Sequence, residues 1–345
     1  MMQRFALHKT LKHCKIKSYT SSLTQQWKYY SLYAWGTSVH NSIPISNDSD
    51  ASTLLSSSKT VYDHPQKLDM DFGDKITDFQ CGKDKSAVIL SNGECYTWGH
   101  NNQGQLGLDH NDTVTKPTLL EMSKSSPISD ISLQTDFSAC VSNGDLYTFG
   151  SNGSAFQGGM GFLGHGDENS YYTPKLVESL IEDGCTTSQV GVGNNHMVVL
   201  TTEGEVLTAG SGSYGRLGNL EPLDQLFLEP VELLAGEDIC QISVGNAFSL
   251  ALTRDGIIHA WGRNDKGQLG DGGGLMVDMY AMESLPVSIQ GQLEGRVVEK
   301  ISAGYAHAAC ITDKGELFFW GMGQSLEPTL MTSMLDKQVI QNWCY

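Results

Sequence analysis

The chain has 345 residues, with 38 glycines and only 9 prolines, and its formal net charge is −17. Such an acidic chain is disfavoured as a binder of the nucleic-acid backbone, because phosphate contacts need clustered lysine and arginine. It contains no run of about 18 apolar residues, so we expect no transmembrane segment. Many glycines without a collagen period favour short strands joined by many tight turns.

The first 47 residues carry basic side chains and no acidic one. Drawn as a helix, Arg4, His8, Lys12 and Lys15 form a basic stripe beside an apolar one, and a serine-rich stretch follows. This combination is typical of a mitochondrial transit peptide, which we expect over residues 1–30. The alternatives are a disordered basic arm or a misassigned start of the chain, with a cytoplasmic or nuclear location.

Five segments repeat one internal spacing, in which a turn glycine is followed six residues later by the glycine of an aromatic-Gly pair or its variant. A fixed spacing of this kind indicates a repeat architecture. A further glycine precedes the turn by eleven residues in four of the segments, and Leu133 takes its place in the second. The five pairs are Gly93 with Trp98-Gly99, Gly144 with Phe149-Gly150, Gly204 with Ala209-Gly210, Gly256 with Trp261-Gly262, and Gly315 with Trp320-Gly321.

Each unit predicts two short strands joined by a hairpin. Apolar runs such as Ala87–Leu90 indicate a buried strand before the turn. Asn92-Gly93, Asn143-Gly144 and Asp255-Gly256 are hairpin dipeptides, because Asn, Asp and Gly tolerate a positive φ. The alternating stretch Glu94–Trp98 is typical of a strand with one buried face. Strand, turn, strand and glycine corner together predict an all-β fold, a β-propeller of four-stranded blades.

Two further motifs make the pattern specific. A Gly-x-Leu-Gly motif follows the glycine of the aromatic-Gly pair, here called the corner glycine. The motif stands at Gly104–Gly107, Gly161–Gly164, Gly215–Gly218 and Gly267–Gly270. A Gly-x-x-His start stands at Gly193–His196 and Gly304–His307, whereas Lys85, Asp136 and Phe248 depart from that histidine. Over about residues 31–345 the chain resembles the regulator of chromosome condensation repeat family. The resemblance implies a ring that usually has seven blades.

The ends of the predicted propeller are incomplete. Tyr33–Gly36 supplies a sixth aromatic-Gly anchor without its preceding strand and turn, and Val339–Tyr345 begins a further unit and stops. Joining the two ends in one blade would avoid a free sheet edge. We therefore expect six or seven blades over residues 31–345, with a flexible serine-rich loop at 41–58. A truncated form of a longer protein is the alternative.

No catalytic constellation stands out. Two Gly-x-Gly-x-x-Gly strings coincide with repeat glycines and no helical period follows them, so a dinucleotide site is not expected. His165, Asp167 and Glu168 lie together after an insertion, but their spacing fits no metal-ligand motif and loop polarity accounts for them better. We expect no cofactor, no metal site and no enzymatic activity.

Two connections depart most from the repeat, at residues 153–161 and 271–285. Loops on a rigid scaffold carry function, and the second loop holds apolar residues that should not face water without reason. It could also fold back on its own blade. The candidate partner-contact residues are Phe156, Phe162, His165, Asp167, Leu275, Met276, Met279, Tyr280 and Met282.

The expected function is therefore a non-catalytic scaffold that binds a protein or ribonucleoprotein partner through its blade loops. The family resemblance implies an alternative, because its founding member exchanges guanine nucleotide on a small Ras-like GTPase by inserting a loop near the nucleotide. An acidic propeller suits a basic GTPase face by charge complementarity. No local motif in this sequence carries the exchange loop over.

Overall fold

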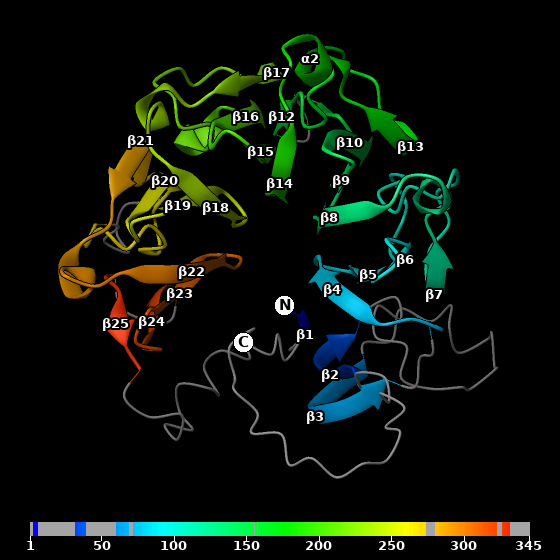
Figure 1. The fold of residues 1–345 in the computed structure, drawn as a ribbon, viewed down its shortest axis with the longest axis horizontal. Coiled ribbons are helices and arrows are strands. Elements are labelled where there is room, and N and C mark those ends of the chain that lie inside the picture. Colours follow the sequence, from blue (N-terminus) through cyan, green and yellow to red (C-terminus); the bar gives the residue numbers. More distant parts are fainter. Residues whose placement is uncertain are drawn as a thin grey trace, which may run out of the picture.

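The computed structural model describes residues 3–5, 32–38, 60–68, 72–154, 156, 158–273, 280–322 and 326–331, the first three segments as backbone strands. Within these residues the fold is all-β. Five four-stranded antiparallel sheets stand around a common axis, as Figure 1 shows. The predicted propeller of four-stranded blades is thus confirmed.

The first strand of each blade lies nearest the axis and the fourth lies at the rim (Figure 1). Blade 1 comprises β4 (Ile76–Cys81), β5 (Lys85–Leu90), β6 (Cys95–Gly99) and β7 (Val114–Leu119), and blade 2 comprises β8 (Ile128–Leu133), β9 (Phe137–Ser142), β10 (Asp145–Gly150) and β13 (Tyr171–Leu176). Blade 3 comprises β14 (Thr187–Val192), β15 (His196–Thr201), β16 (Val206–Gly210) and β17 (Gln225–Pro230). Blade 4 comprises β18 (Ile239–Val244), β19 (Phe248–Thr253), β20 (Ile258–Arg263) and β21 (Met282–Ser288). Blade 5 comprises β22 (Val298–Ala303), β23 (His307–Thr312), β24 (Leu317–Gly321) and β25 (Thr329–Leu330).

Short helical turns follow the fourth strand of most blades. They are η1 (Glu121–Lys124), α2 (Glu178–Glu182), η4 (Glu232–Leu234) and η5 (Gly291–Leu293), and a further turn, η3 (Ser213–Gly215), lies between β16 and β17. None is long or apolar enough to cross a membrane within the described residues.

A sixth sheet is three-stranded, in the order β1 (Gln3–Phe5), β2 (Leu32–Ser38), β3 (Thr60–Leu68). Strand β2 carries the Trp35-Gly36 anchor, and its pairing with β3 shifts register there as β6 and β7 do at Trp98-Gly99. It is therefore equivalent to the third strand of a blade. Residues 6–30 of the expected transit peptide, the 41–58 loop and Val339–Tyr345 lie outside the described residues.

The hydrophobic core lies between blades. In β5, β9, β15 and β19 every residue is buried, because the neighbouring sheets cover both faces of these second strands. One core cluster joins Phe137 and Val141 of blade 2 to Val190 and Met197 of blade 3, and a similar one joins blades 4 and 5. Adjacent blades consequently stabilise each other through apolar burial.

Aromatic residues and corner glycines lock adjacent blades together. The indole Nε1 of Trp261 donates to the backbone oxygen of Arg216 over 3.0 Å, and that of Trp320 donates to the backbone oxygen of Gln268 over the same distance. A Cβ at Gly270 would lie 2.7 Å from the Trp320 Nε1, on a backbone with φ +74°. The aromatic-Gly pair and the Gly-x-Leu-Gly motif are therefore two halves of one contact between blades.

In the second repeat, the spacing between the second strand and the turn glycine differs from the spacing that the other repeats predict. Its hairpin is a two-residue turn in which both Asn143 (φ 54°) and Gly144 (φ 88°) are left-handed, as type I′ turns require. The other hairpins are longer, so the residue equivalent to His196 is Phe137 and not Asp136. Gln134, and not Leu133, occupies the place of the preceding glycine, because its amide donates to Phe137 as that of Gly193 donates to His196.

The repeat histidine links blades through a side chain. Fully buried His196 lies with Nε2 2.9 Å from the Ser249 hydroxyl of blade 4. In blade 1 the same position holds buried Lys85, whose Nζ donates to the backbone oxygens of Gln134 and Thr135 in blade 2. Burial lowers the pKa of Lys85 to about 7. The side chains at this repeat position therefore stabilise the contact between neighbouring blades.

Replacing Gly270 with alanine should destabilise the fold by about 2–4 kcal/mol, because the new Cβ meets Trp320 on a left-handed backbone. Gly295 has the same φ of +74° but nothing within 4 Å, so Gly295→Ala should cost only about 1 kcal/mol of backbone strain. Denaturant unfolding of both variants measures the difference. Equal losses would show that the indole contact does not hold the blades together.

Candidate protein-binding face

One face of the ring, here called the corner face, is formed by the described residues of the connections between the third and fourth strands, at residues 100–113, 151–154, 156, 158–170, 211–224, 264–273 and 280–281. Most exposed large apolar side chains lie on or beside this face. They are Phe156, Tyr172, Leu220, Leu223, Phe227, Tyr280, Met282, Tyr305 and Met322, whereas Ile181, Leu233, Ile257 and Val297 lie on the opposite face. The apolar surface available to a partner is thus concentrated on the corner face.

The insertion in blade 2 forms a small hairpin, β11 (Gly153–Ser154) with β12 (Gly159–Met160). Phe156, between the two strands, is fully exposed at 103% of its reference area. Gly153 and Gly159 have φ of +78° and +135°, and a Cβ at either would strike a neighbour at 2.4 Å. Glycine is therefore required for the hairpin to pass so close to the propeller.

The hairpin is fastened to blade 3. Asp224 accepts the amide of Met160 over 2.9 Å with one carboxylate oxygen and the amide of Gly212 over 3.1 Å with the other. The side-chain nitrogen of Asn195 donates to the backbone oxygen of Gly158 over 3.0 Å. These bonds, at Gly158 and Met160, fasten the second half of the hairpin beside the exposed phenylalanine.

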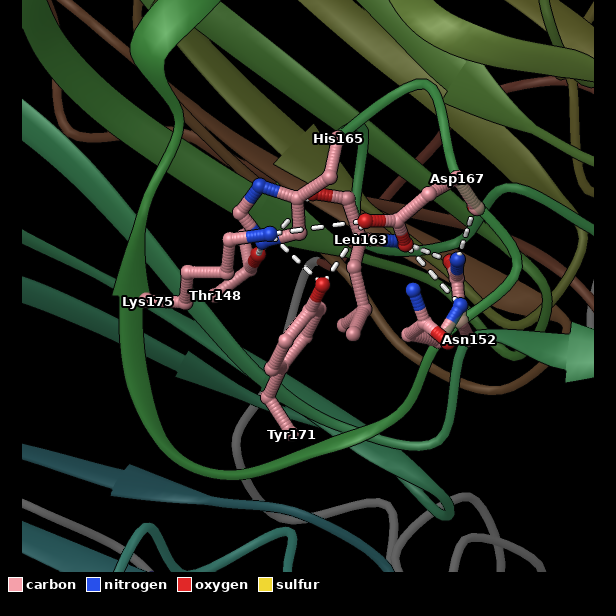
Figure 2. A network of polar contacts seen from close by, with 8 residues as sticks. Thr148, Asn152, Leu163, His165, Asp167, Tyr171 and Lys175 are labelled. Atoms are coloured by element: carbon pink, nitrogen blue, oxygen red, sulfur yellow. Dashed lines mark hydrogen bonds and ion pairs between the residues drawn. The ribbon is translucent and has the colours of Figure 1, made fainter.

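Figure 2 shows the polar network at the base of this insertion, where two of the candidate contact residues, His165 and Asp167, come together. The Tyr171 hydroxyl donates to Asp167 over 2.7 Å and accepts from Lys175 Nζ over 2.6 Å. The His165 and Tyr171 rings meet edge to face with centroids 5.2 Å apart. The insertion is thus bound to strand β13 of its own blade.

The other side of the network binds the loop backbone. The Thr148 hydroxyl donates to the backbone oxygen of Leu163 over 2.9 Å, so it accepts from His165 Nε2, also 2.9 Å away. Asn152 accepts the amide of Leu163 over 2.9 Å and donates to the backbone oxygen of Asp167. His165 and Asp167 therefore position the loop.

The ionisation states agree with this structural role. Burial and the charge of Lys175 lower the pKa of His165 to about 4, so the imidazole is neutral at pH 7. Burial raises the pKa of Asp167, but hydrogen bonds from Tyr171 and Asn169 and the charge of Lys175 outweigh it and hold that pKa at about 2. Neither pKa lies near neutrality, where general acid–base catalysis works best.

The remaining candidate contact residues separate into different environments. Phe162 is buried with its ring 5.6 Å from that of Phe137, so it supports the hairpin from the core and is not available to a partner. Tyr280 and Met282 are exposed at 72% and 46%. Leu275, Met276 and Met279 lie outside the described residues. Within the part of the chain described, no group of three or more potential metal ligands is present.

Sequence reasoning missed two exposed leucines in the blade 3 connection. Leu220 and Leu223 are exposed at 73% and 66%, and the backbone oxygen of Leu223 packs against Gly212. They stand in a short Leu-Glu-Pro-Leu stretch, where no periodicity marks them. The available signal was two leucines beside Pro222, a residue that favours a loop.

Comparison with known proteins identifies the repeat. Two family profiles described as Regulator of chromosome condensation (RCC1) repeat match this chain, one over residues 92–141, 143–200, 203–252 and 255–311 and the other over 76–105, 188–216 and 239–268. The chain belongs to this family.

Relatives of this RCC1-repeat protein are diverse. It is 33% identical over 250 residues to E3 ubiquitin-protein ligase HERC2 of Homo sapiens, covering 72% of this chain and 5% of the relative. It is 35% identical to the Secretion-regulating guanine nucleotide exchange factor of Bos taurus, covering 68% and 50%, and 29% identical to Ultraviolet-B receptor UVR8 of Arabidopsis thaliana, covering 85% and 61%. The chain thus spans less than two thirds of each of these relatives.

Solved structures show the same fold at lower identity. Prp20p from Saccharomyces cerevisiae superimposes with a TM-score of 0.72 and 19% identity, covering 88% of this RCC1-repeat chain and 74% of that one. Human WBSCR16 superimposes with a TM-score of 0.68 and 19% identity, covering 88% and 78%. Both support the propeller architecture.

Asp224→Ala should release the hairpin, because two backbone amides lose their acceptor at once. Hydrogen exchange at Met160 and Gly212 should become at least about tenfold faster, as a loss of 1.4 kcal/mol or more implies. Asp112→Ala, an exposed aspartate in the corresponding connection of blade 1, is the control. Unchanged exchange in Asp224→Ala would show that the carboxylate does not fasten the hairpin.

Proposed function

We propose that this RCC1-repeat protein is a non-catalytic scaffold that binds a protein partner through its corner face. The observation that carries the proposal is the gathering of Phe156, Leu220, Leu223, Tyr280 and Met282 on the connections of three consecutive blades. Aromatic and methionine side chains are enriched in the buried centres of protein interfaces. Rigid presentation favours affinity, because less conformational entropy is lost on binding.

The proposal also includes the absence of enzymatic activity. It is supported by the polar cluster of Figure 2, whose histidine and aspartate have pKa values of about 4 and about 2 and are both engaged in loop contacts. An activated acid or base would need a pKa near neutrality and a free reacting atom. These groups fit a fastening role better.

Proximity labelling with the intact chain tests the scaffold role. A Phe156→Ser, Tyr280→Ser variant should lose at least about tenfold of the labelled partners, because truncation of interface hot spots costs 2 kcal/mol or more. The matched control is Ile181→Ser, Leu233→Ser, which alters exposed apolar residues on the opposite face. Partners lost in the control and retained in the test variant would place binding on that other face.

A second candidate function is guanine-nucleotide exchange on a small Ras-like GTPase. The β11–β12 hairpin favours it, since an insertion fastened to blade 3 and carrying a fully exposed phenylalanine is suited to displace a loop of a bound protein. The 35% identity to a guanine nucleotide exchange factor gives further support. The net charge of −17 suits a basic face of such a partner.

Exchange is tested by adding the purified protein to small GTPases loaded with labelled GDP. If the hairpin acts as an exchange element, nucleotide release should accelerate by at least about tenfold, and Phe156→Ala should remove 1.4 kcal/mol or more of that effect. Ile181→Ala should leave release unchanged. Release at the intrinsic rate from every GTPase tried would reject this second function and leave the scaffold proposal intact.

We also propose a mitochondrial location. The basic, acid-free and serine-rich N-terminal segment supports it, because this composition is typical of transit peptides. The labelling experiment above reports the compartment together with the neighbours. Neighbours drawn from the cytoplasm or nucleus alone would contradict the location without affecting the role of the corner face.

A further inference from the structure

The corner loop of blade 3 departs from the motif that closes the corresponding loops in blades 1 and 4. There, Asn101 and Asn264 accept the amide of the motif leucine over 2.8 and 3.2 Å. The motif glutamines, Gln105 and Gln268, accept a backbone amide of their own loop over 2.8 and 2.7 Å. Blade 3 has Gly212 in place of the asparagine and Arg216 in place of the glutamine. In blade 3 the two amide side chains that close the loop are thus replaced by a glycine and a positively charged arginine.

Arg216 is buried, with only 5% of its surface exposed, and its Nε donates to the backbone oxygen of Ser213 over 2.8 Å. Among the arginines whose side chains the structure describes, the other three pair with a carboxylate: Arg254 with Asp238, Arg263 with Asp265, and Arg296 with Glu316. Arg216 has no carboxylate partner in the described chain. Apart from the Nε bond, its guanidinium makes no side-chain hydrogen bond to another of the described residues.

Tyr214 brings a second arginine close to the first. The Arg216 guanidinium carbon lies 5.6 Å from the centroid of the Tyr214 ring, and that of Arg263 lies 4.8 Å from the same ring. Tyr214 has φ 59°, a left-handed conformation that is strained for an aromatic residue. Such strain is concentrated at functional sites, and here the strained residue places its ring within 6 Å of two guanidinium groups.

The nearby carboxylates do not satisfy this cationic group. Asp265 lies 2.8 Å from Arg263 and 3.6 Å from Lys266, so a single carboxylate serves two cations. Both oxygens of Asp224 are occupied by backbone amides, as described above. Arg216 is therefore left without a carboxylate in direct contact, although Asp224 lies close enough for its charge to favour the charged form of Arg216.

We infer that Arg216 and Arg263, which both lie against the Tyr214 ring, form a recognition site for an Asp or Glu side chain of the protein partner. The inference rests on the proposed binding role of the corner face. A carboxylate matches the remaining guanidinium donors in charge and in planar geometry. Insertion of the partner's carboxylate would supply the ion pair that Arg216 lacks.

The surroundings of the site favour a protein carboxylate over a phosphate. Arg263 pairs with exposed Met282 across the β20–β21 ladder, and the amide of the next residue, Asn264, donates to the backbone oxygen of Ala281, beside exposed Tyr280. Exposed Leu223 adjoins the same loop through Gly212. A central charged pair bordered by apolar contacts is the usual composition of a protein interface hot spot. The strongly negative chain repels a nucleic-acid backbone.

Selection from a displayed library of random dodecapeptides against the intact protein tests the site. We expect enrichment of peptides in which Asp or Glu adjoins an aromatic or aliphatic residue. Arg216→Gln should weaken their binding at least about tenfold, since a charge-assisted pair is lost. This variant introduces the glutamine that blades 1 and 4 already carry, so the fold is retained. Replacing the peptide carboxylate with its amide should have the same effect.

The controls separate this inference from the proposed function. Arg254→Gln is the matched substitution on the opposite face and should leave peptide binding unchanged. Inorganic phosphate at millimolar concentration should not compete, and competition by phosphate would reject a protein carboxylate as the ligand. Peptides that depend on Phe156 or Tyr280 but bind equally to Arg216→Gln would retain the binding face and overturn the carboxylate site. A selection that returns no peptide dependent on Arg216 also overturns it.

Discussion

The contact on which the rest of this structure depends is the hydrogen bond from the indole of one blade to the corner loop of the blade before it. Trp261 and Trp320 each donate to a backbone oxygen within the preceding Gly-x-Leu-Gly motif, and the motif's last glycine lies against the indole. Because glycine has no side chain, the indole packs directly against its backbone, and this close contact fixes the distance between neighbouring blades. Variation is consequently concentrated in the connections between the third and fourth strands, outside the glycines that make this contact.

Much of the fold could be predicted because this contact imposes a spacing on the sequence. The interval from turn glycine to corner glycine is set by the length of one strand, and all five complete blades keep it. The interval before the turn is set by hairpin type, which sequence alone did not distinguish. The left-handed Asn143 shortens the second hairpin, so counting back from Gly144 gave Asp136 where the structure has Phe137.

The candidate site was less predictable, because its residues are marked by departures from the repeat and not by a period. Phe156 and Tyr280 lie in irregular connections, and both are exposed, whereas contact with a partner stays a prediction. Phe162 was predicted to contact a partner, but it is buried. It occupies the variable position of a displaced Gly-x-Leu-Gly motif, and its side chain at that position packs in the core. The hairpin β11–β12 has strands of only two residues, too short for alternation to show.

The departures fall on consecutive blades, and this arrangement limits what kind of partner fits. Blade 2 contributes the β11–β12 hairpin. Blade 3 contributes Asp224, which holds that hairpin, and the loop that carries Arg216, whereas blade 4 contributes Arg263 and Tyr280. Hydrogen bonds across the blade boundaries join them in one surface. A stable protein interface needs about 800 Å² from each partner, more than a single loop supplies. Three adjoining connections offer a partner more surface than any one of them, which favours one protein domain that spans them.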